Sequence, residues 1–362
     1  MVRVTVPIPG RSYQVTVGSD VIVTAGEHLP DLPEATQAFV VVDRMVADAW
    51  FGPLAGALAS AGLVAVPLIV PAGEDAKTLQ VHQTLLHQLA MQSAHRSDVV
   101  VALGGGATGD LAGFLAATYM RGLPLVQVPT TLTAQVDASV GGKTAVNLPE
   151  GKNLVGVFHQ PVAVLADVGT LATLPDRDFR SGLAEVAKYG LTLDPDLLAD
   201  LEEDPAPVLA REAGAMEELV ARCVRVKAAA VAEDERDTGR RLVLNYGHTL
   251  GHALERLEAF GGRTHGEAIA VGMVFAARLA ERLGRAAPGL ARRTVRLLSS
   301  LGLQTGGPLP DAGAITAAFA LDKKYQGGVR FVLLEDVGRP VIVDDVPERT
   351  IVEVLEEMGA AA

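Results

Sequence analysis

The chain has 362 residues, enough for two domains that each bury a substantial core. Glycine and proline occur at ordinary frequency, which argues against a disordered or fibrous protein, and the single cysteine, Cys223, permits no internal disulfide. Acidic residues outnumber basic ones and give a formal net charge of -12, so we expect no nucleic-acid partner. No apolar run reaches the roughly 18 residues of a membrane span, and the opening MVRVTVPIPG lacks the features of a secretory signal. We therefore expect a cytoplasmic protein with no membrane partner.

The first half of the chain alternates apolar runs with helical patterns. It opens with a predicted hairpin, VRVTVPI and YQVTV, and predicted strands follow at 38–43, 63–70, 98–106, 123–131 and 162–168. The clearest helical patterns between them lie at 77–94 and 109–120. Nearly continuous apolar strands separated by helices indicate a parallel sheet that is covered on both faces. We predict an α/β fold with a Rossmann-like, nucleotide-binding N-terminal domain over residues 1–175.

Long amphipathic patterns dominate the second half, so we predict a mostly α-helical C-terminal domain over residues 176–362. A short strand pair around Gly338 and a last helix near 348–358 complete the prediction. The principal helices are expected at 207–235, 242–259, 266–284 and 288–301.

Glycines follow the third apolar strand in the spacing G-x-G-x-x-G, at Gly104, Gly106 and Gly109. Backbone amides at such a turn can receive a pyrophosphate at a helix N-terminus, although a tight turn with close helix packing also explains the glycines. An ordinary dinucleotide-binding unit places its ribose-binding acid on the strand after this turn. Here the acids that follow strands, Asp43 and Glu74, lie upstream, and either could instead be a helix cap or a solvated loop acid.

The segment 130–153, TTLTAQVDASVGGKTAVNLPEGKN, carries Asp137, Lys143, Lys152 and Asn153 among glycines and hydroxyls. Open parallel sheets bind ligands beyond the carboxyl ends of their strands, so this segment is a candidate anion site, with a solvated loop as the alternative. Arg121 lies just before the predicted strand at 123–131, which leads into this segment. It could contribute to this site or to the site of a neighbouring subunit.

Three histidines gather late in the chain, with His248 and His252 four residues apart and His265 after a glycine turn. Two or three histidines with one carboxylate are the usual ligands of a catalytic zinc ion. The residues alone do not decide which glutamate provides the carboxylate ligand: Glu185, Glu255 and Glu267 are all candidates. Glu185 and Lys188 are three apart on one predicted helical face, where an exposed ion pair is the alternative to a functional role.

Together, the motifs LGGGATGDLAGF, VPTT, QVDASVGGKTAVN, GKNLVG, GLAEVAKYG, NYGHTLGHALE, HGEA and DKK resemble, in the same order, the 3-dehydroquinate synthases, a family of sugar phosphate cyclases. The resemblance runs from about residue 43 to 324. It implies a homodimer that uses NAD and one divalent metal, zinc or cobalt. The implied reaction converts 3-deoxy-D-arabino-heptulosonate 7-phosphate to 3-dehydroquinate and phosphate.

The resemblance also implies roles for individual residues. The implied metal ligands are Glu185, His248 and His265, which moves His252 to the substrate. The implied substrate groups are Arg121 (from the partner subunit), Asp137, Lys143, Asn153, Lys188, Lys227, Arg241, Asn245, His252 and one of Lys323 and Lys324. The implied NAD-binding residues are Asp43, Glu74, Lys77, Gly105, Gly106, Asp110, Thr130, Thr131, Lys143, Lys152, Thr173 and Leu174.

Three other functions compete with this interpretation. A related cyclase of the aminodehydroquinate or epi-valiolone type would share the cofactors and the fold. The epi-valiolone type acts on a substrate without the carboxylate. A carboxylated substrate is favoured by Arg241, Asn245, His252 and the lysines of the DKK motif, Lys323 and Lys324. A metal-dependent polyol dehydrogenase would leave the many lysines unexplained, and a non-catalytic nucleotide-binding protein would make the glutamate and histidine set accidental.

Overall fold

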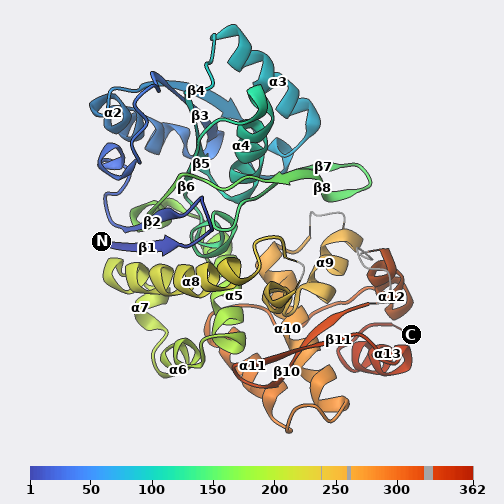
Figure 1. Cartoon of the computed structure of the whole chain (residues 1–362). Coiled ribbons are helices and arrows are strands. Elements are labelled where there is room, and N and C mark those ends of the chain that lie inside the picture. Colours follow the sequence, from blue (N-terminus) through green and yellow to red (C-terminus); the bar gives the residue numbers. More distant parts are fainter. Residues whose placement is uncertain (238, 259–261, 322–328, 362) are drawn as a thin grey trace. The chain divides into compact units, whose positions relative to one another are not determined.

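A computed structural model describes residues 1–237, 239–258, 262–321 and 329–361 of the chain (Figure 1). Contacts within it divide the chain into two compact units. The first contains Met1–Pro175 and Arg211–Arg236, and the second contains Asp176–Ala210 and Asp237–Ala362. Residues 211–236 thus cluster with the first unit, although their place in the sequence put them in the predicted C-terminal domain.

A seven-stranded sheet forms the centre of the first unit, in the order β1-β2-β9-β6-β5-β3-β4. All neighbouring pairs are parallel except the antiparallel hairpin β1–β2. This arrangement confirms the predicted Rossmann-like fold and all of its predicted strands. Their bounds are β1 Val2–Val6, β2 Tyr13–Gly18, β3 Gln37–Asp43, β4 Val64–Val70, β5 Val99–Gly104, β6 Leu125–Pro129 and β9 Ala163–Asp167.

The interior residues of β3 are all apolar because their side chains point alternately to two buried clusters. Phe39 and Val41 enter one buried cluster, with side chains of α3 (Leu79–Met91) and α4 (Gly106–Thr118). Val40 and Val42 enter a second cluster, with side chains of α2 (Gly52–Ser60). Helices therefore cover both faces of the sheet, and the central strands have no solvent-facing side, whereas the edge strands β1 and β4 expose some of their residues. The short helix α1 (Arg44–Val46) follows β3 directly.

A second hairpin occupies part of the segment 130–153, which was predicted to be a ligand-binding loop. Strand β7 (Lys143–Leu148) pairs antiparallel with β8 (Gly151–Phe158). The sequence KTAVNL has no strict alternation, and the glycines and the proline on either side of it are typical of loops. Ala134–Ala138, just before the hairpin, forms a single π-helical turn, a feature that often occurs at functional sites.

Helices make up most of the second unit, as predicted (Figure 1). The predicted helix at 207–235 is in fact divided between α7 (Ala206–Leu209) and α8 (Ala213–Glu233), and α8 belongs to the first unit. The predicted helix at 242–259 begins only at His248, because Gly247 has a left-handed φ of 80°. The other helices are α5 Asp176–Thr192, α6 Pro195–Glu203, α9 His248–Leu257, α10 His265–Arg282, α11 Leu290–Ser300, α12 Ala312–Leu321 and α13 Glu348–Glu357.

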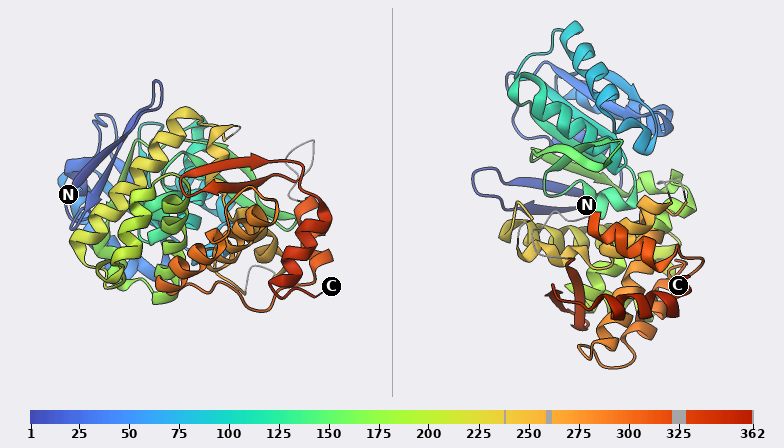
Figure 2. Two further views of the ribbon diagram at one scale, coloured as in Figure 1. Left: turned by 90° about the horizontal axis from the view of Figure 1, so that it is seen from below. Right: turned by 90° about the vertical axis from the view of Figure 1, so that its right-hand side faces the viewer.

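The predicted late strand pair is present as β10 (Phe331–Asp336) and β11 (Arg339–Val343), which turn at Gly338. Figure 2 shows this pair in red beside the orange helices of the same unit, and the Phe331 ring packs at a tilt against Phe275 of α10, with ring centroids 6.1 Å apart. Among the described residues, no helix is both long and apolar enough to cross a membrane.

Candidate functional site

The glycine turn between β5 and α4 is tightly packed at two of its positions. A Cβ atom on Gly104 would lie 2.8 Å from Thr108 Oγ1, and one on Gly109 would lie 2.8 Å from Gln127 Oε1. Close packing therefore explains these two glycines. Gly105 and Gly106, the pair assigned to NAD, open helix α4 with extended backbone at Gly105, so the first amides of α4 have no helical acceptor.

Two buried hydroxyls lie beside this turn. Thr130, at the end of β6, donates its backbone N–H to Gly104 O at 2.9 Å. Its Oγ1 atom and that of Thr108 are buried without a hydrogen-bond partner among the described residues. Buried polar atoms without a partner require an explanation, and a bound ligand supplies one. The turn and these hydroxyls thus fit a dinucleotide phosphate, with Thr131 packed against Gly105.

Asp43 is the last residue of β3, and Glu74 lies four residues after the end of the neighbouring parallel strand β4. Asp43 caps α1 by accepting from Met45 N at 2.9 Å, which is the structural role considered from sequence. Glu74 is not merely solvated, because Asn147 Nδ2 donates to its carboxylate at 2.6 Å and Lys152 Nζ lies 4.0 Å away. A ribose-binding role for Asp43 stays a prediction.

A buried lysine links α4 to the β7–β8 hairpin. Lys77 forms an ion pair with Asp110 and donates to Asn153 Oδ1 at 2.5 Å. Burial raises the pKa of Asp110, and the positive charge of Lys77 offsets part of that rise. Asn153 has a left-handed φ of 57° and donates its N–H to Asn147 Oδ1 at 3.0 Å. Asn147 was missed from sequence because an asparagine in a presumed loop has no distinguishing spacing.

Other predicted residues of the first unit fall at different places. Lys227, buried on α8, lies 2.8 Å from Asp137 Oδ1, so two of the assigned substrate groups already form an ion pair. Arg121 is exposed after α4, near the amino ends of the strands, whereas the glycine turn lies at their carboxyl ends. Thr173 and Leu174 follow β9, and Thr173 Oγ1 accepts from Trp50 Nε1 at 3.5 Å. Lys143 is exposed at the start of β7.

In the second unit, Glu185 of α5, His248 of α9 and His265 of α10 converge. Each offers one ligand atom, and these three atoms lie within 4.8 Å of one another. His265 Nε2 is 3.1 Å and His248 Nε2 is 3.4 Å from Glu185 Oε1. Two imidazoles and one carboxylate are a suitable donor set for zinc or cobalt, and the chemistry of this set therefore fits the implied metal.

Electrostatics keep these three groups in distinct protonation states. Burial opposes ionisation of Glu185, but Lys188 and the two imidazoles hold its pKa well below the ordinary value. Burial lowers the pKa of His248 to about 4, which leaves a neutral imidazole. For His265, contacts with Glu185 and Glu255 outweigh burial and raise the pKa to about 10. The Glu185–Lys188 ion pair is thus present but buried, in contrast to the exposed pair considered from sequence.

Hydrogen bonds on the far side of each imidazole fix its orientation. His248 Nδ1 lies 3.1 Å from Tyr246 O, and His265 Nδ1 lies 3.3 Å from Glu255 Oε2. Both oxygens can only accept, so each ring has a proton on Nδ1. Nε2 of the neutral His248 is available to a metal, and Nε2 of His265 would become available when a metal displaces its second proton. Glu255, one of the open alternatives for a ligand, instead supports a ligand from behind.

Two glycines allow the three helices to approach. A Cβ atom on Gly266 would collide with Ser181 O of α5, and one on Gly272 would collide with Gly247 O. Because Gly266 follows His265 directly, its close packing on α5 places the imidazole next to Glu185. Glu267, the remaining alternative, is occupied as well: it completes a capping box with Thr264 and pairs with Arg177.

His252 lies beside the donor set without belonging to it. Its ring is exposed and stands perpendicular to that of His248, with centroids 5.3 Å apart. Spacing alone had suggested His248 and His252 as a metal pair, and the donor atoms that converge are those of His265 and Glu185 instead. Among the other assigned groups, Lys188 and Arg241 are buried and Asn245 is half-buried, while Lys323 and Lys324 lie outside the described residues.

Known structures share this whole architecture. A 2-deoxy-scyllo-inosose synthase, solved with carbaglucose-6-phosphate, NAD⁺ and Co²⁺, is 31% identical, with a TM-score of 0.89 over 99% of this chain and 100% of its own. A 2-epi-5-epi-valiolone synthase from Streptomyces hygroscopicus, solved with NAD⁺ and Zn²⁺, is 28% identical, with a TM-score of 0.87 over 96% of both chains. The fold and the metal-donor set therefore place the chain in the class of sugar phosphate cyclases.

The chain belongs to the 3-dehydroquinate synthase family. The family's N-terminal model matches residues 67–181, and its C-terminal model matches residues 182–325. A 3-dehydroquinate synthase from Geobacter metallireducens is 45% identical over 339 residues, which cover 93% of this chain and 94% of the relative.

Proposed function

We propose that this protein converts 3-deoxy-D-arabino-heptulosonate 7-phosphate to 3-dehydroquinate and inorganic phosphate, with NAD and one divalent metal. The observation that carries the proposal is the convergence of Glu185, His248 and His265 beside a buried Lys188, in a chain of this family. A donor set of this kind suits a catalytic metal, and a buried ammonium next to it suits an anionic substrate.

When bound, NAD accepts a hydride and later returns it, and the metal polarises the oxygen at the carbon that is oxidised. The chain's own groups bind and orient the substrate. Lys188 and Arg241 are buried cations of the second unit, and Lys227 is a buried cation of the first. They provide fixed positive charge for a phosphate and a carboxylate in a protein whose net charge is -12.

His252 is the best placed group to move a proton. Its imidazole is exposed beside the metal donors, with ring centroids 5.3 Å from His248 and 6.2 Å from His265. A general base must reach the proton that it removes, and an exposed imidazole beside the metal donors is within reach of a substrate bound there. After phosphate leaves, ring opening and aldol closure need mainly orientation by the binding groups.

Two related reactions are the alternatives. A cyclase of the aminodehydroquinate or epi-valiolone type would use the same donor set and dinucleotide turn. The groups assigned to the carboxylate, namely Arg241, Asn245 and His252, favour the carboxylated heptulosonate over the epi-valiolone substrate. A metal-dependent polyol dehydrogenase would give no role to the buried lysines.

Incubation of the zinc-loaded protein and NAD with the heptulosonate 7-phosphate tests the proposal. We expect one phosphate released per substrate consumed, together with a product whose mass and chromatographic behaviour match 3-dehydroquinate. Parallel reactions contain the amino analogue and a heptulose phosphate without the carboxylate. Turnover of only one of these analogues would replace the proposal with the corresponding related cyclase.

A homodimer that contributes Arg121 to the partner's site, and a cytoplasmic location, are part of the same proposal. The exposure of Arg121 at the amino ends of the strands supports a role outside its own dinucleotide turn. Sedimentation equilibrium measures the oligomeric state directly. Mixing Arg121→Ala and His248→Ala proteins should restore turnover in mixed dimers, and a lack of restoration would remove Arg121 from the partner's site.

A further inference from the structure

An arginine-rich segment in the second unit takes no part in the proposed reaction. Between residues 278 and 296 the chain carries six arginines and a single acid, Glu281, although the whole protein has a net charge of -12. These residues span the end of α10, the following turn and most of α11. Such a local excess of one charge attracts ions of the opposite sign.

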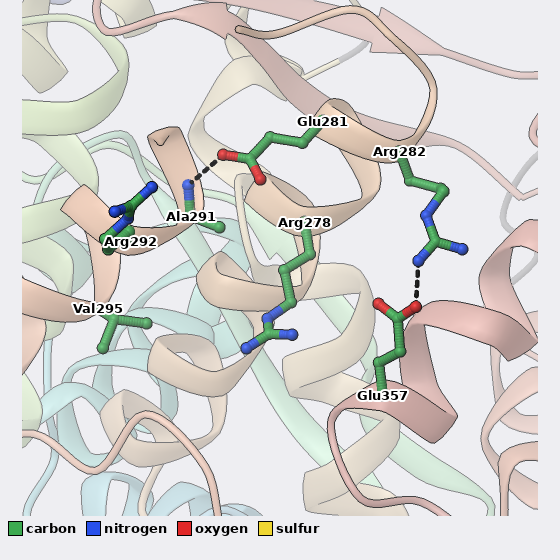
Figure 3. Close-up of a pocket in the computed structure, with 7 residues that line it drawn as sticks. All are labelled: Arg278, Glu281, Arg282, Ala291, Arg292, Val295 and Glu357. Carbon is green, nitrogen blue, oxygen red and sulfur yellow. Dashed lines mark hydrogen bonds and ion pairs between the residues drawn. The ribbon is translucent and has the colours of Figure 1, made fainter. Parts of the chain in front are cut away.

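A pocket of about 610 Å³ lies within this segment (Figure 3). Its volume falls within the range of small-molecule sites. The walls come from the end of α10, the start of α11 and the end of α13, through Arg278, Glu281, Arg282, Ala291, Arg292, Val295 and Glu357.

Both carboxylates of the pocket already have partners. Glu281 Oε1 accepts from the backbone N–H groups of Gly289 at 2.8 Å and Ala291 at 3.0 Å. Glu357 forms an ion pair with Arg282, which also lies 3.2 Å from Glu353. These contacts account for the acids and for one of the three guanidinium groups.

The contacts of the two carboxylates do not involve the other two guanidinium groups of the pocket, those of Arg278 and Arg292. Arg278 Nε is buried and has no hydrogen-bond partner among the described residues. Arg292 is exposed, and no described residue forms a hydrogen bond or ion pair with its side chain. Figure 3 shows the Arg278 guanidinium in the middle of the pocket, with Arg292 on one side and the Arg282–Glu357 pair on the other. A ligand that pairs with both arginines would satisfy the buried donor.

We propose that this pocket binds a small hydroxylated molecule with phosphate or carboxylate groups. The planar fork of arginine pairs with either anion through two parallel hydrogen bonds. Glu281 Oε2, which receives neither of the two backbone bonds, can accept from a ligand hydroxyl, and Val295 provides an apolar contact.

This site is separate from the metal donors. Arg278 follows His265 by 13 residues on the same helix, α10. At 1.5 Å per residue the two Cα atoms lie about 20 Å apart along the helix axis. A small molecule that contacts Arg278 and Arg292 therefore does not contact the metal donors.

Calorimetric titration of the full, zinc-loaded chain tests the proposal, with pyrophosphate as the phosphate probe and malate as the carboxylate probe. Both titrations are run at one fixed ionic strength, because salt screens unspecific attraction. We expect the doubly substituted protein Arg278→Gln/Arg292→Gln to bind at least one probe about tenfold more weakly than the parent. Weaker binding of pyrophosphate would indicate a phosphate ligand, and weaker binding of malate would indicate a carboxylate ligand.

Arg285→Gln is the matched control, since Arg285 is exposed in the same segment but does not line the pocket. It should bind both probes like the parent, and all variants should turn over the heptulosonate phosphate at the parent's rate. Equal affinities in the parent and the double variant would overturn the proposal, as would equal weakening by Arg285→Gln. A parent protein without turnover would count against the proposed reaction only.

Discussion

Replacement of Glu255 tests whether the carboxylate behind His265 helps to hold the metal. Glu255 is buried on α9, and its Oε2 atom lies 3.3 Å from His265 Nδ1, while His265 Nε2 faces Glu185. Glu255→Leu removes the acceptor that keeps the proton on Nδ1. The imidazole then loses both its fixed orientation and the basicity that a carboxylate partner confers.

The geometry sets the expected magnitude. Loss of such a supporting partner costs about ten- to a hundredfold in metal affinity, or about 1.4 to 2.7 kcal/mol. The contact of 3.3 Å is longer than the roughly 2.8 Å of a strong charge-assisted hydrogen bond, so we expect about tenfold weaker zinc binding. Glu255→Gln keeps an oxygen acceptor without the charge, and its loss should be smaller, about threefold.

Competition with a chromophoric chelator measures zinc affinity, and the visible spectrum of the cobalt-loaded protein reports the geometry of the ligands. We expect a shifted cobalt spectrum in Glu255→Leu and one closer to the parent in Glu255→Gln. Thermal unfolding of the metal-free proteins separates a general loss of stability from a loss at the site. Parent-like zinc affinity and an unchanged cobalt spectrum in Glu255→Leu would refute the role of Glu255 in positioning His265.

Three further predictions concern individual side chains. His252→Ala should keep nearly one equivalent of zinc by elemental analysis and lose most turnover, since its ring lies outside the donor set; loss of the metal would return it to the ligands. Asp43→Asn should retain the cap of α1, because asparagine caps equally well, and weaken NAD binding in fluorescence titrations; parent-like affinity would contradict a ribose role. Asp98→Asn should lower the free energy of unfolding by about 1 to 3 kcal/mol at pH 7, because the carboxylate accepts three backbone N–H groups. Those bonds outweigh burial and hold the pKa of Asp98 below 3.8, so the difference from the parent in denaturant titrations should narrow below about pH 4; a difference that grows there would contradict this sign.

The sequence was sufficient to predict the sheet because its central strands are buried on both faces. Runs such as AFVVV and VVVAL have no solvent-facing residue, which predicts parallel strands covered by helices on both sides. The hairpin β7–β8 could not be predicted in the same way. Strand β8 is largely exposed, and Gly156 interrupts its apolar residues, so no continuous buried apolar run marks the hairpin.

The placement of α8 shows a different limit. Its amphipathic pattern predicts a helix but does not say which core receives the apolar side chains. Residues 211–236 return to the first unit, where α8 brings Lys227 to Asp137, across 90 positions of the sequence. A contact between residues so far apart in the sequence leaves no pattern in the sequence around either residue.

The metal donors show what spacing can and cannot decide. The i, i+4 relation of His248 and His252 places both rings on one side of α9, and that part of the prediction is correct. The choice of donor depends on α5 and α10, which bring Glu185 and His265 against His248. Glu255 and Glu267 are equally plausible ligands in the sequence, and only packing assigns the first to His265 Nδ1 and the second to a helix cap.

A transient-kinetic experiment tests most directly whether NAD is oxidant and reductant in one catalytic cycle. Zinc-loaded protein with bound NAD is mixed rapidly with the heptulosonate 7-phosphate, while the absorbance of NADH and the release of phosphate are recorded together. The account predicts that NADH rises and then decays within each turnover, with phosphate accumulating to one equivalent of the substrate. NADH that accumulates with turnover, without release of phosphate, would identify a polyol dehydrogenase and contradict the account.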